Sequence, residues 1–144
     1  MRNLLILVTL SMIIPAFAGD LRLEDESFRT LAYIREDGRI EDASFSTLGY
    51  IRDDSRIEDS SFQTLGYIRD GIIEGSSFNT LYHLEDDGRL TDTSFSNILT
   101  ISSDGTVEDR NFSTMLYTDG SDDAMLVRIA AFIVFFSDLV PEPD

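Results

Sequence analysis

Apolar and polar residues alternate in short runs along most of the chain, and this alternation predicts β-strands. Within residues 38–54, the segment 39–42 (Arg-Ile-Glu-Asp) alternates polar and apolar side chains, and the segment 47–52 (Thr-Leu-Gly-Tyr-Ile-Arg) is rich in β-forming residues. Runs of this kind, bounded by Asp, Gly and Ser, are typical of hairpin strands. We therefore expect each copy of this stretch to form two short strands.

The copies are marked by a phenylalanine that recurs at a nearly constant spacing. Successive markers are separated by 17, 17, 16, 17 and 17 positions: Phe28, Phe45, Phe62, Phe78, Phe95 and Phe112. A period this short indicates one supersecondary unit that buries its apolar face only against its neighbours. The chain is therefore expected to hold six hairpins, or about twelve strands.

The period of two in a strand places one apolar site of each strand on the inner face of the sheet. The first strands contribute Leu23, Ile40, Ile57, Ile73, Leu90 and Val107, and the second strands contribute Ile34, Ile51, Ile68, Leu84 and Ile101. Gly49 and Gly66 share this face, and a strand glycine often marks close approach of another group. We expect something to pack against them, and we place these tyrosines on the outer face: Tyr33, Tyr50, Tyr67 and Tyr117.

Asp-Gly or a related pair separates successive copies, as at Asp37-Gly38 and Asp70-Gly71. Asp-Gly between alternating strands is a strong hairpin signal, and open sheet edges invite aggregation. The sequence therefore predicts a mainly β fold, a shallow closed antiparallel barrel of about six radiating β-hairpin repeats with period 17. Its radius of roughly 12 Å would leave room for one helix along the axis.

The repeat pattern ends at Gly120, and an almost uniformly apolar segment follows. Residues 124–136 contain Arg128 as their one polar residue, and Pro141 lies beyond them. A helix that is apolar all round is typically buried, and about 20 Å of helix is short for a bilayer core of roughly 30 Å. We expect residues 121–140 to form a helix that fills or plugs the central channel, with a carboxylate or carbonyl partner for Arg128 near a rim.

The N-terminus has the three parts of a secretory signal peptide. Arg2 gives a cationic start, residues 4–14 form an apolar run, and residues 16–18 (Ala-Phe-Ala) match a small-x-small cleavage pattern. We expect cleavage between Ala18 and Gly19, so the protein would be secreted or periplasmic. The chain is thus expected to divide into a signal peptide (1–18), a hairpin barrel (19–120), a C-terminal helix (121–140) and a tail (141–144).

The cadence of residues 38–51 is Gly-x-Ile-x-Asp-x-x-Phe-x-x-Leu-Gly-Tyr-Ile, and it repeats in tandem over about residues 20–119. In this it resembles the β-flower repeat proteins, often labelled five-fold β-flower proteins. The resemblance implies a shallow barrel of radiating hairpins with an apolar central channel and no catalytic residues. Twelve strands with an apolar C-terminal helix are also similar in architecture to the tubby C-terminal domain and the phospholipid scramblases, in which such a helix threads the barrel.

The chain departs from this cadence in two ways. It has six phenylalanine markers where the family label says five. In copies four and five, Tyr82 and Leu99 stand at the position of Gly49, and Gly75 stands at the position of Asp42. We therefore expect imperfect symmetry in these copies.

The charge of the chain opposes one class of partner. The chain has 11 cationic residues, all of them Arg, against 27 acidic residues, for a formal net charge of -16. Nucleic-acid backbones are bound by clustered cations, so no nucleic-acid partner is expected. The absence of Cys removes disulfides, thiolate metal sites and cysteine nucleophiles.

The sequence offers little catalytic chemistry. His83 is the one histidine and occupies the position of Tyr50 and Tyr67, so we expect a ring on the outer face. It lacks the base and orienting groups that a nucleophile needs, and we expect a non-enzymatic protein with no cofactor. Acids recur three residues before Phe: Asp25, Asp42, Asp59, Asp92 and Asp109. Such acids either bind calcium or cap turns; we expect capping and no metal site.

The marker phenylalanines have two alternative placements. Either they fold inward and plug the barrel floor, or they stay exposed as an apolar ring at one rim, where they would meet the end of the helix. The candidate apolar rim is Phe28, Phe45, Phe62, Phe78, Phe95, Phe112, Phe132 and Phe136. An exposed ring would be a contact surface for a lipid, an apolar ligand or a protein partner. We therefore expect an exported structural or interaction module, or alternatively a calcium- or glycan-binding surface protein that uses its acidic turns.

Overall fold

The structure is a computed structural model that describes residues 19–120 and 123–143, so the predicted signal peptide at 1–18 lies outside the described residues. The described chain forms twelve strands followed by one helix, α1 (Asp123–Phe136). The strands are β1 (Leu21–Asp25), β2 (Thr30–Ile34), β3 (Arg39–Asp42), β4 (Thr47–Ile51), β5 (Arg56–Asp59), β6 (Thr64–Arg69), β7 (Ile72–Gly75), β8 (Thr80–Leu84), β9 (Arg89–Thr91), β10 (Asn97–Ile101), β11 (Thr106–Asp109) and β12 (Thr114–Thr118).

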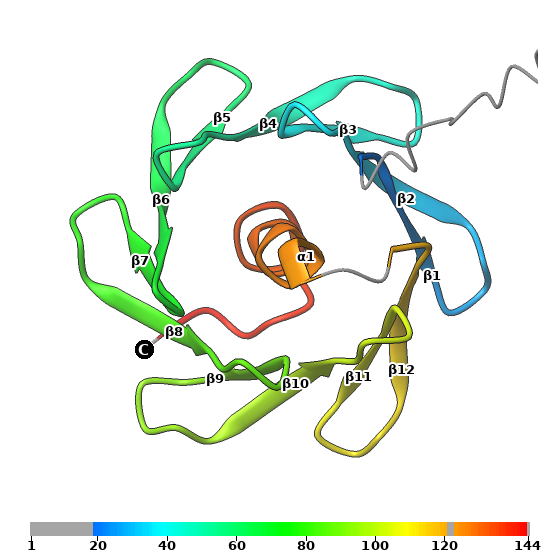
Figure 1. The fold of residues 1–144 in the computed structure, drawn as a ribbon, viewed down its shortest axis with the longest axis vertical. Coiled ribbons are helices and arrows are strands. Elements are labelled where there is room, and N and C mark those ends of the chain that lie inside the picture. Colours follow the sequence, from blue (N-terminus) through cyan, green and yellow to red (C-terminus); the bar gives the residue numbers. More distant parts are fainter. Residues whose placement is uncertain (1–18, 121–122, 144) are drawn as a thin grey trace, which may run out of the picture.

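The strands form one closed antiparallel barrel in which every strand pairs with its neighbours in sequence. Closure occurs between the first and last strands, where Leu23 of β1 lies opposite Thr118 of β12. The predicted mainly β fold and closed antiparallel barrel are confirmed. Twelve strands agree with six hairpin repeats, and Figure 1 shows the loop within each repeat at the outer edge of the ring.

Each hairpin bends at one place. The register between the two strands of every repeat shifts once, for example between Ile40 and Glu41 in the pair β3–β4, whereas pairs that join different repeats keep a continuous register. A bulge of this kind bends a strand and increases its local twist. The bend lets the loop of each repeat project away from the barrel while the rest of the strand stays in its wall.

The single 16-residue spacing has a local cause. In the join between the third and fourth repeats, Arg69 pairs with Ile72, so only Asp70 and Gly71 form the turn. Both residues have positive φ angles, 51° and 75°. Two central residues with positive φ define the tight hairpin turn for which Asp-Gly is preferred.

The inner face of the barrel is the predicted one. All six apolar sites of the first strands have no exposed surface: Leu23, Ile40, Ile57, Ile73, Leu90 and Val107. The sites of the second strands are also buried, apart from the half-buried Ile51. Burial of these side chains stabilises the association of the hairpins.

In Figure 1, α1 lies inside the ring of strands. Ile129, Ala130 and Ile133 have no exposed surface. The two strand glycines face the last turn of the helix: a Cβ on Gly49 would lie 2.5 Å from Cζ of Phe136, and one on Gly66 would lie 2.7 Å from Phe135. The expectation that something packs against these glycines is confirmed, because only a residue without a side chain allows the rings so close.

Arg128 is satisfied by backbone oxygens. Its guanidinium donates to the carbonyls of Gly19 (2.5 Å), Ile34 (3.0 Å) and Arg35 (2.6 Å). The predicted carbonyl partner is therefore present: the carbonyls belong to a residue just before β1 and to two residues at and just after the end of β2. Within residues 19–120 and 123–143, no helix has the length and apolar content required for a membrane span.

Candidate functional site

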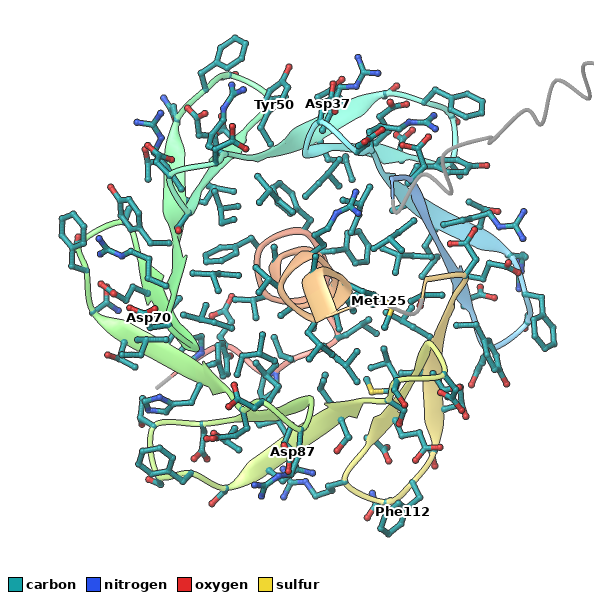
Figure 2. The ribbon with its side chains drawn as sticks, in the orientation of Figure 1. Asp37, Tyr50, Asp70, Asp87, Phe112 and Met125 are labelled. Atoms are coloured by element: carbon teal, nitrogen blue, oxygen red, sulfur yellow. The ribbon has the colours of Figure 1, made fainter. Side chains whose placement is uncertain are left out.

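The outer surface carries a repeated aromatic arrangement that we call the aromatic edge. It consists of the six marker phenylalanines and the rings stacked on them. Each marker ring is exposed: Phe28 (66%), Phe45 (62%), Phe62 (61%), Phe78 (59%), Phe95 (64%) and Phe112 (84%). Figure 2 shows Phe112 at the perimeter, pointing away from the barrel. Of the two alternatives for the six markers, inward folding as a plug of the barrel is therefore wrong, and the exposed placement is the observed one.

The backbone explains why the rings stay outside. Each marker has a positive φ angle, between 61° for Phe28 and 66° for Phe62. This left-handed region favours Gly or Asn, and a bulky side chain there is uncommon. The conformation turns the marker ring back along the outer surface toward the preceding repeat.

An aspartate three residues earlier holds the loop in this shape. Oδ1 of Asp42 accepts hydrogen bonds from the backbone N–H groups of Ser44 (2.8 Å) and Ser46 (3.0 Å), while the N–H of Phe45 donates to the Asp42 carbonyl (3.0 Å). The same pattern recurs in four other loops, at Asp25, Asp59, Asp92 and Asp109. These bonds support the prediction of turn capping.

Capping lowers the pKa of the Asp25 carboxyl, and the fourth repeat has no aspartate at the capping position. The backbone N–H of Arg29 bonds to the Asp25 carboxylate and lowers the pKa of that carboxyl. In the fourth repeat Gly75 stands at the aspartate position, and a Cβ there would lie 2.8 Å from Oδ1 of Asn79. The Asn79 side chain thus occupies the space beside the turn.

Five of the markers stack on a ring from the preceding repeat. The centroid distances run from 4.4 to 5.2 Å, and the angles between ring planes run from 15° to 21°. The pairs are Phe28–Tyr117, Phe45–Tyr33, Phe62–Tyr50, Phe78–Tyr67 and Phe95–His83. The predicted outer-face position of these tyrosines is confirmed, and the stacks link each hairpin to its neighbour outside the barrel wall.

At three of these junctions an arginine lies over both stacked rings. The guanidinium carbons of Arg35, Arg52 and Arg69 lie 4.4 to 5.0 Å from the tyrosine centroids and 5.8 Å from the phenylalanine centroids. Each arginine also pairs with a glutamate of the next repeat, as Arg35 does with Glu41 at 2.9 Å. The hydrogen bond from Arg35 lowers the pKa of the Glu41 carboxyl.

A model of the family described as "5-fold beta-flower protein" matches residues 20–136. The chain belongs to this family. The resemblance based on the repeat cadence is confirmed, and the match extends through α1, beyond the residues that carry the cadence. No curated protein and no solved structure matches the chain significantly.

In this β-flower, the remaining predicted rim residues do not join the aromatic edge. Phe132 is buried, with 4% of its surface exposed, and the half-buried Phe136 lies against Gly49. Both belong to the interior packing of α1. The eight predicted rim residues therefore fall into two groups, six at the perimeter and two inside, because the helix directs its rings toward the strands.

His83 occupies the outer-face position expected for it. Its ring stacks on Phe95 with centroids 4.4 Å apart, so it takes the place of a tyrosine in the aromatic edge. Among the residues that the structure describes, no group of three or more His, Cys, Asp or Glu side chains could hold a metal ion.

Tyr82 explains one departure from the repeat cadence. It stands where the second and third repeats have Gly49 and Gly66, and it is 2% exposed on the inner face. Its hydroxyl donates to the carbonyl of Pro141 in the C-terminal tail, and burial raises the pKa of this hydroxyl. A cavity of about 400 Å³ lies beside it, lined by residues that include Val134 and Glu142. The larger side chain thus holds the C-terminal tail at Pro141.

Sequence reasoning missed the arginines that cover the stacked rings of the β-flower. The signal was present, because Tyr33 and Arg35 are two residues apart and so share one face of a strand. The same spacing recurs at Tyr50 and Arg52, and at Tyr67 and Arg69.

Proposed function

We propose that this β-flower is an exported, non-enzymatic interaction module that contacts its partner through the aromatic edge. The observation that carries the proposal is the set of six exposed phenylalanines held at positive φ. Exposed aromatic rings contribute less to the stability of the fold than buried ones, and each marker also bears the cost of a left-handed backbone. The rings are spaced around the perimeter, so each loop offers its own exposed apolar contact point.

We further propose that α1 is a permanent filling of the central channel, so that ligands bind outside it. The absence of exposed surface on Ile129, Ala130 and Ile133 supports this proposal, as does the contact of Phe136 with Gly49. The three carbonyl bonds of Arg128 tie the helix to residues near β1 and β2. Withdrawal of α1 would break these three bonds and expose the apolar inner face to water.

The arrangement of the marker loops limits how the aromatic edge can contact a lipid surface. The loops that carry the markers point outward in different directions around the ring (Figure 1). A flat bilayer would therefore meet only adjacent loops at one time. The net charge of -16 disfavours anionic lipid, so zwitterionic lipid is the relevant membrane probe.

Glycine at the marker positions provides the test. In the triple variant Phe45→Gly/Phe62→Gly/Phe95→Gly, the rings are lost but the backbone angle is kept. We expect cooperative thermal unfolding to persist, and we expect loss of whatever binding the wild type shows to phosphatidylcholine vesicles or to an apolar fluorescent dye. Equal binding by both proteins, or failure of the variant to fold, would overturn the proposal.

Export is tested separately. Expression with residues 1–18 in a secreting host, followed by mass measurement of the released protein, should give a chain that begins at Gly19. Retention of the full-length chain inside the cell would contradict this part of the proposal.

A further inference from the structure

The sixth junction of the aromatic edge, between β10 and β11, lacks the ring that completes the other five. Thr100 lies opposite Glu108 in the register, just as Tyr50 lies opposite Glu58 in the equivalent pair of strands. Phe112 has the loop conformation of the other markers, with a φ angle of 63°. Within the described part of the chain no ring stacks on it, and its exposure of 84% is the largest of the six.

The same junction lacks a cation. The glutamates equivalent to Glu108 in the first four repeats all pair with arginine: Glu24 with Arg22, Glu41 with Arg35, Glu58 with Arg52 and Glu74 with Arg69. At the sixth junction both arginine positions hold neutral residues, Ser102 and Thr106. Among the residues that the structure describes, the half-buried Glu108 forms no ion pair.

The other junctions of this molecule define what is missing. At the junction of Tyr67 and Phe78, the ring centroids are 4.8 Å apart, the Arg69 guanidinium lies 5.0 Å from the tyrosine centroid, and Arg69 pairs with Glu74 at 3.4 Å. Ring and guanidinium come from residues two apart on one extended strand. Their side chains therefore leave the strand on the same side.

We propose that Phe112 and Glu108 form a docking site for an extended aromatic-x-arginine segment of a partner protein. The aromatic ring of the partner stacks on Phe112, and its guanidinium pairs with Glu108 while covering the ring. Arginine suits this position because its planar cation both stacks on rings and pairs with carboxylates. The net charge of -16 attracts a cationic segment. The proposal rests on the proposed function of the aromatic edge and names the chemistry of one partner.

The probe for this site is the peptide acetyl-Tyr-Ile-Arg-amide, which has the sequence of residues 67–69. Titration into the isotopically labelled mature chain, followed by amide NMR shifts, should perturb Thr100, Glu108 and Phe112. One stack and one exposed ion pair correspond to a dissociation constant on the order of 10 mM. Acetyl-Tyr-Ile-Gln-amide and acetyl-Ala-Ile-Arg-amide should each bind several-fold more weakly.

Variants of the chain complete the test. Phe112→Ser and Glu108→Gln should weaken binding of the arginine peptide several-fold, whereas the matched control Arg110→Ala should leave it unchanged. The variant Thr100→Tyr/Ser102→Arg should fill the site from within, raising the unfolding temperature and abolishing peptide binding. Absence of shifts at these residues at about 10 mM peptide, or equal shifts with all three peptides, would overturn the inference.

The two proposals fail in different ways. If the peptides do not bind but the triple glycine variant still loses vesicle or dye binding, only the assignment of this site is wrong. If the peptide binds as expected and the glycine variant keeps its vesicle and dye binding, the site stands and the general role of the other five markers is wrong.

Discussion

The ring of Phe28 stacks on the ring of Tyr117 at a centroid distance of 4.7 Å, which joins the first repeat to the last. The backbone pairing of β1 with β12 closes the barrel wall at the same junction. The barrel is therefore closed both by backbone hydrogen bonds and by a side-chain stack. The stack can be removed by substitution without changing the strands.

Replacement of Phe28 by Ala should lower the free energy of unfolding by about 1 kcal/mol, because a stacked aromatic pair contributes about 0.5–1.5 kcal/mol. For a domain of about 100 residues this corresponds to a fall of roughly 4–8 °C in unfolding temperature. Thermal unfolding of the mature chain measures it. Phe112→Ala is the matched control, since Phe112 has no stacked ring among the described residues, and it should cost less. Equal losses for the two variants would contradict a stabilising role for the stack.

Two substitutions at Phe45 should separate the cost of the backbone from the value of the ring. Phe45→Ala loses the stack on Tyr33 and keeps the φ angle of 65°, so it should destabilise by about 1–2 kcal/mol. Phe45→Gly also loses the stack but relieves a backbone cost of about 1–2 kcal/mol, so its stability should stay close to that of the wild type. Chemical denaturation gives both values. A glycine variant less stable than the alanine variant would show that the backbone is not strained.

The pair of Arg35 and Glu41 should make stability depend on acidity. The hydrogen bond from Arg35 holds the folded-state pKa of Glu41 below its ordinary value. The carboxylate therefore contributes stability above the unfolded pKa of about 4.3, and this contribution is lost as the pH falls through the lower folded pKa. Between pH 7 and pH 3, we expect the wild type to lose more stability than Glu41→Gln. Parallel curves for the two proteins would refute the linkage.

Removal of residues 121–144 should abolish cooperative unfolding, because the inner-face side chains and the two strand glycines pack against α1. A shorter deletion of residues 141–144 serves as the control. It removes only the tail and the hydrogen bond from Tyr82 to Pro141, and it should leave a cooperative transition at a modestly lower temperature. A long deletion that still unfolds cooperatively and binds an apolar dye would show that α1 is a removable plug.

Calcium should not change the unfolding temperature of the mature chain. The loop aspartates already accept backbone hydrogen bonds, as Asp59 does from Ser61 at 2.8 Å. A cation would have to compete with these bonds. Thermal unfolding with calcium and with chelator tests this expectation, and a rise of several degrees with calcium would restore the alternative of an acidic calcium-binding surface.

The sequence was most informative where one period controls the structure. The spacing of the markers predicted the hairpins, and the alternation around Ile40 predicted the inner face, because side-chain direction in a strand follows from position alone. The placement of the markers did not follow, because it depends on the positive φ of Phe45. A glycine in the sequence suggests a positive φ angle, whereas a phenylalanine does not.

The candidate site was visible only in part for a related reason. The stack of Phe45 on Tyr33 joins side chains of two repeats, so it depends on how one hairpin is placed beside the next. The cadence of a single repeat carries no direct record of that placement. The missing ring at Thr100 is recognised only from the strand register, which shows that Thr100 is the equivalent of Tyr50.

Closure of the barrel also limits how the number of repeats can change in evolution. In an open solenoid a duplicated repeat extends the array, since each unit touches only its neighbours. Here a seventh hairpin would raise the strand number from twelve to fourteen and widen the ring around a helix of unchanged girth. Phe136 would then withdraw from Gly49, and the interior would be left with voids. Related sequences can therefore diverge by substitution within the hairpins, whereas the enclosed helix keeps the number of hairpins constant.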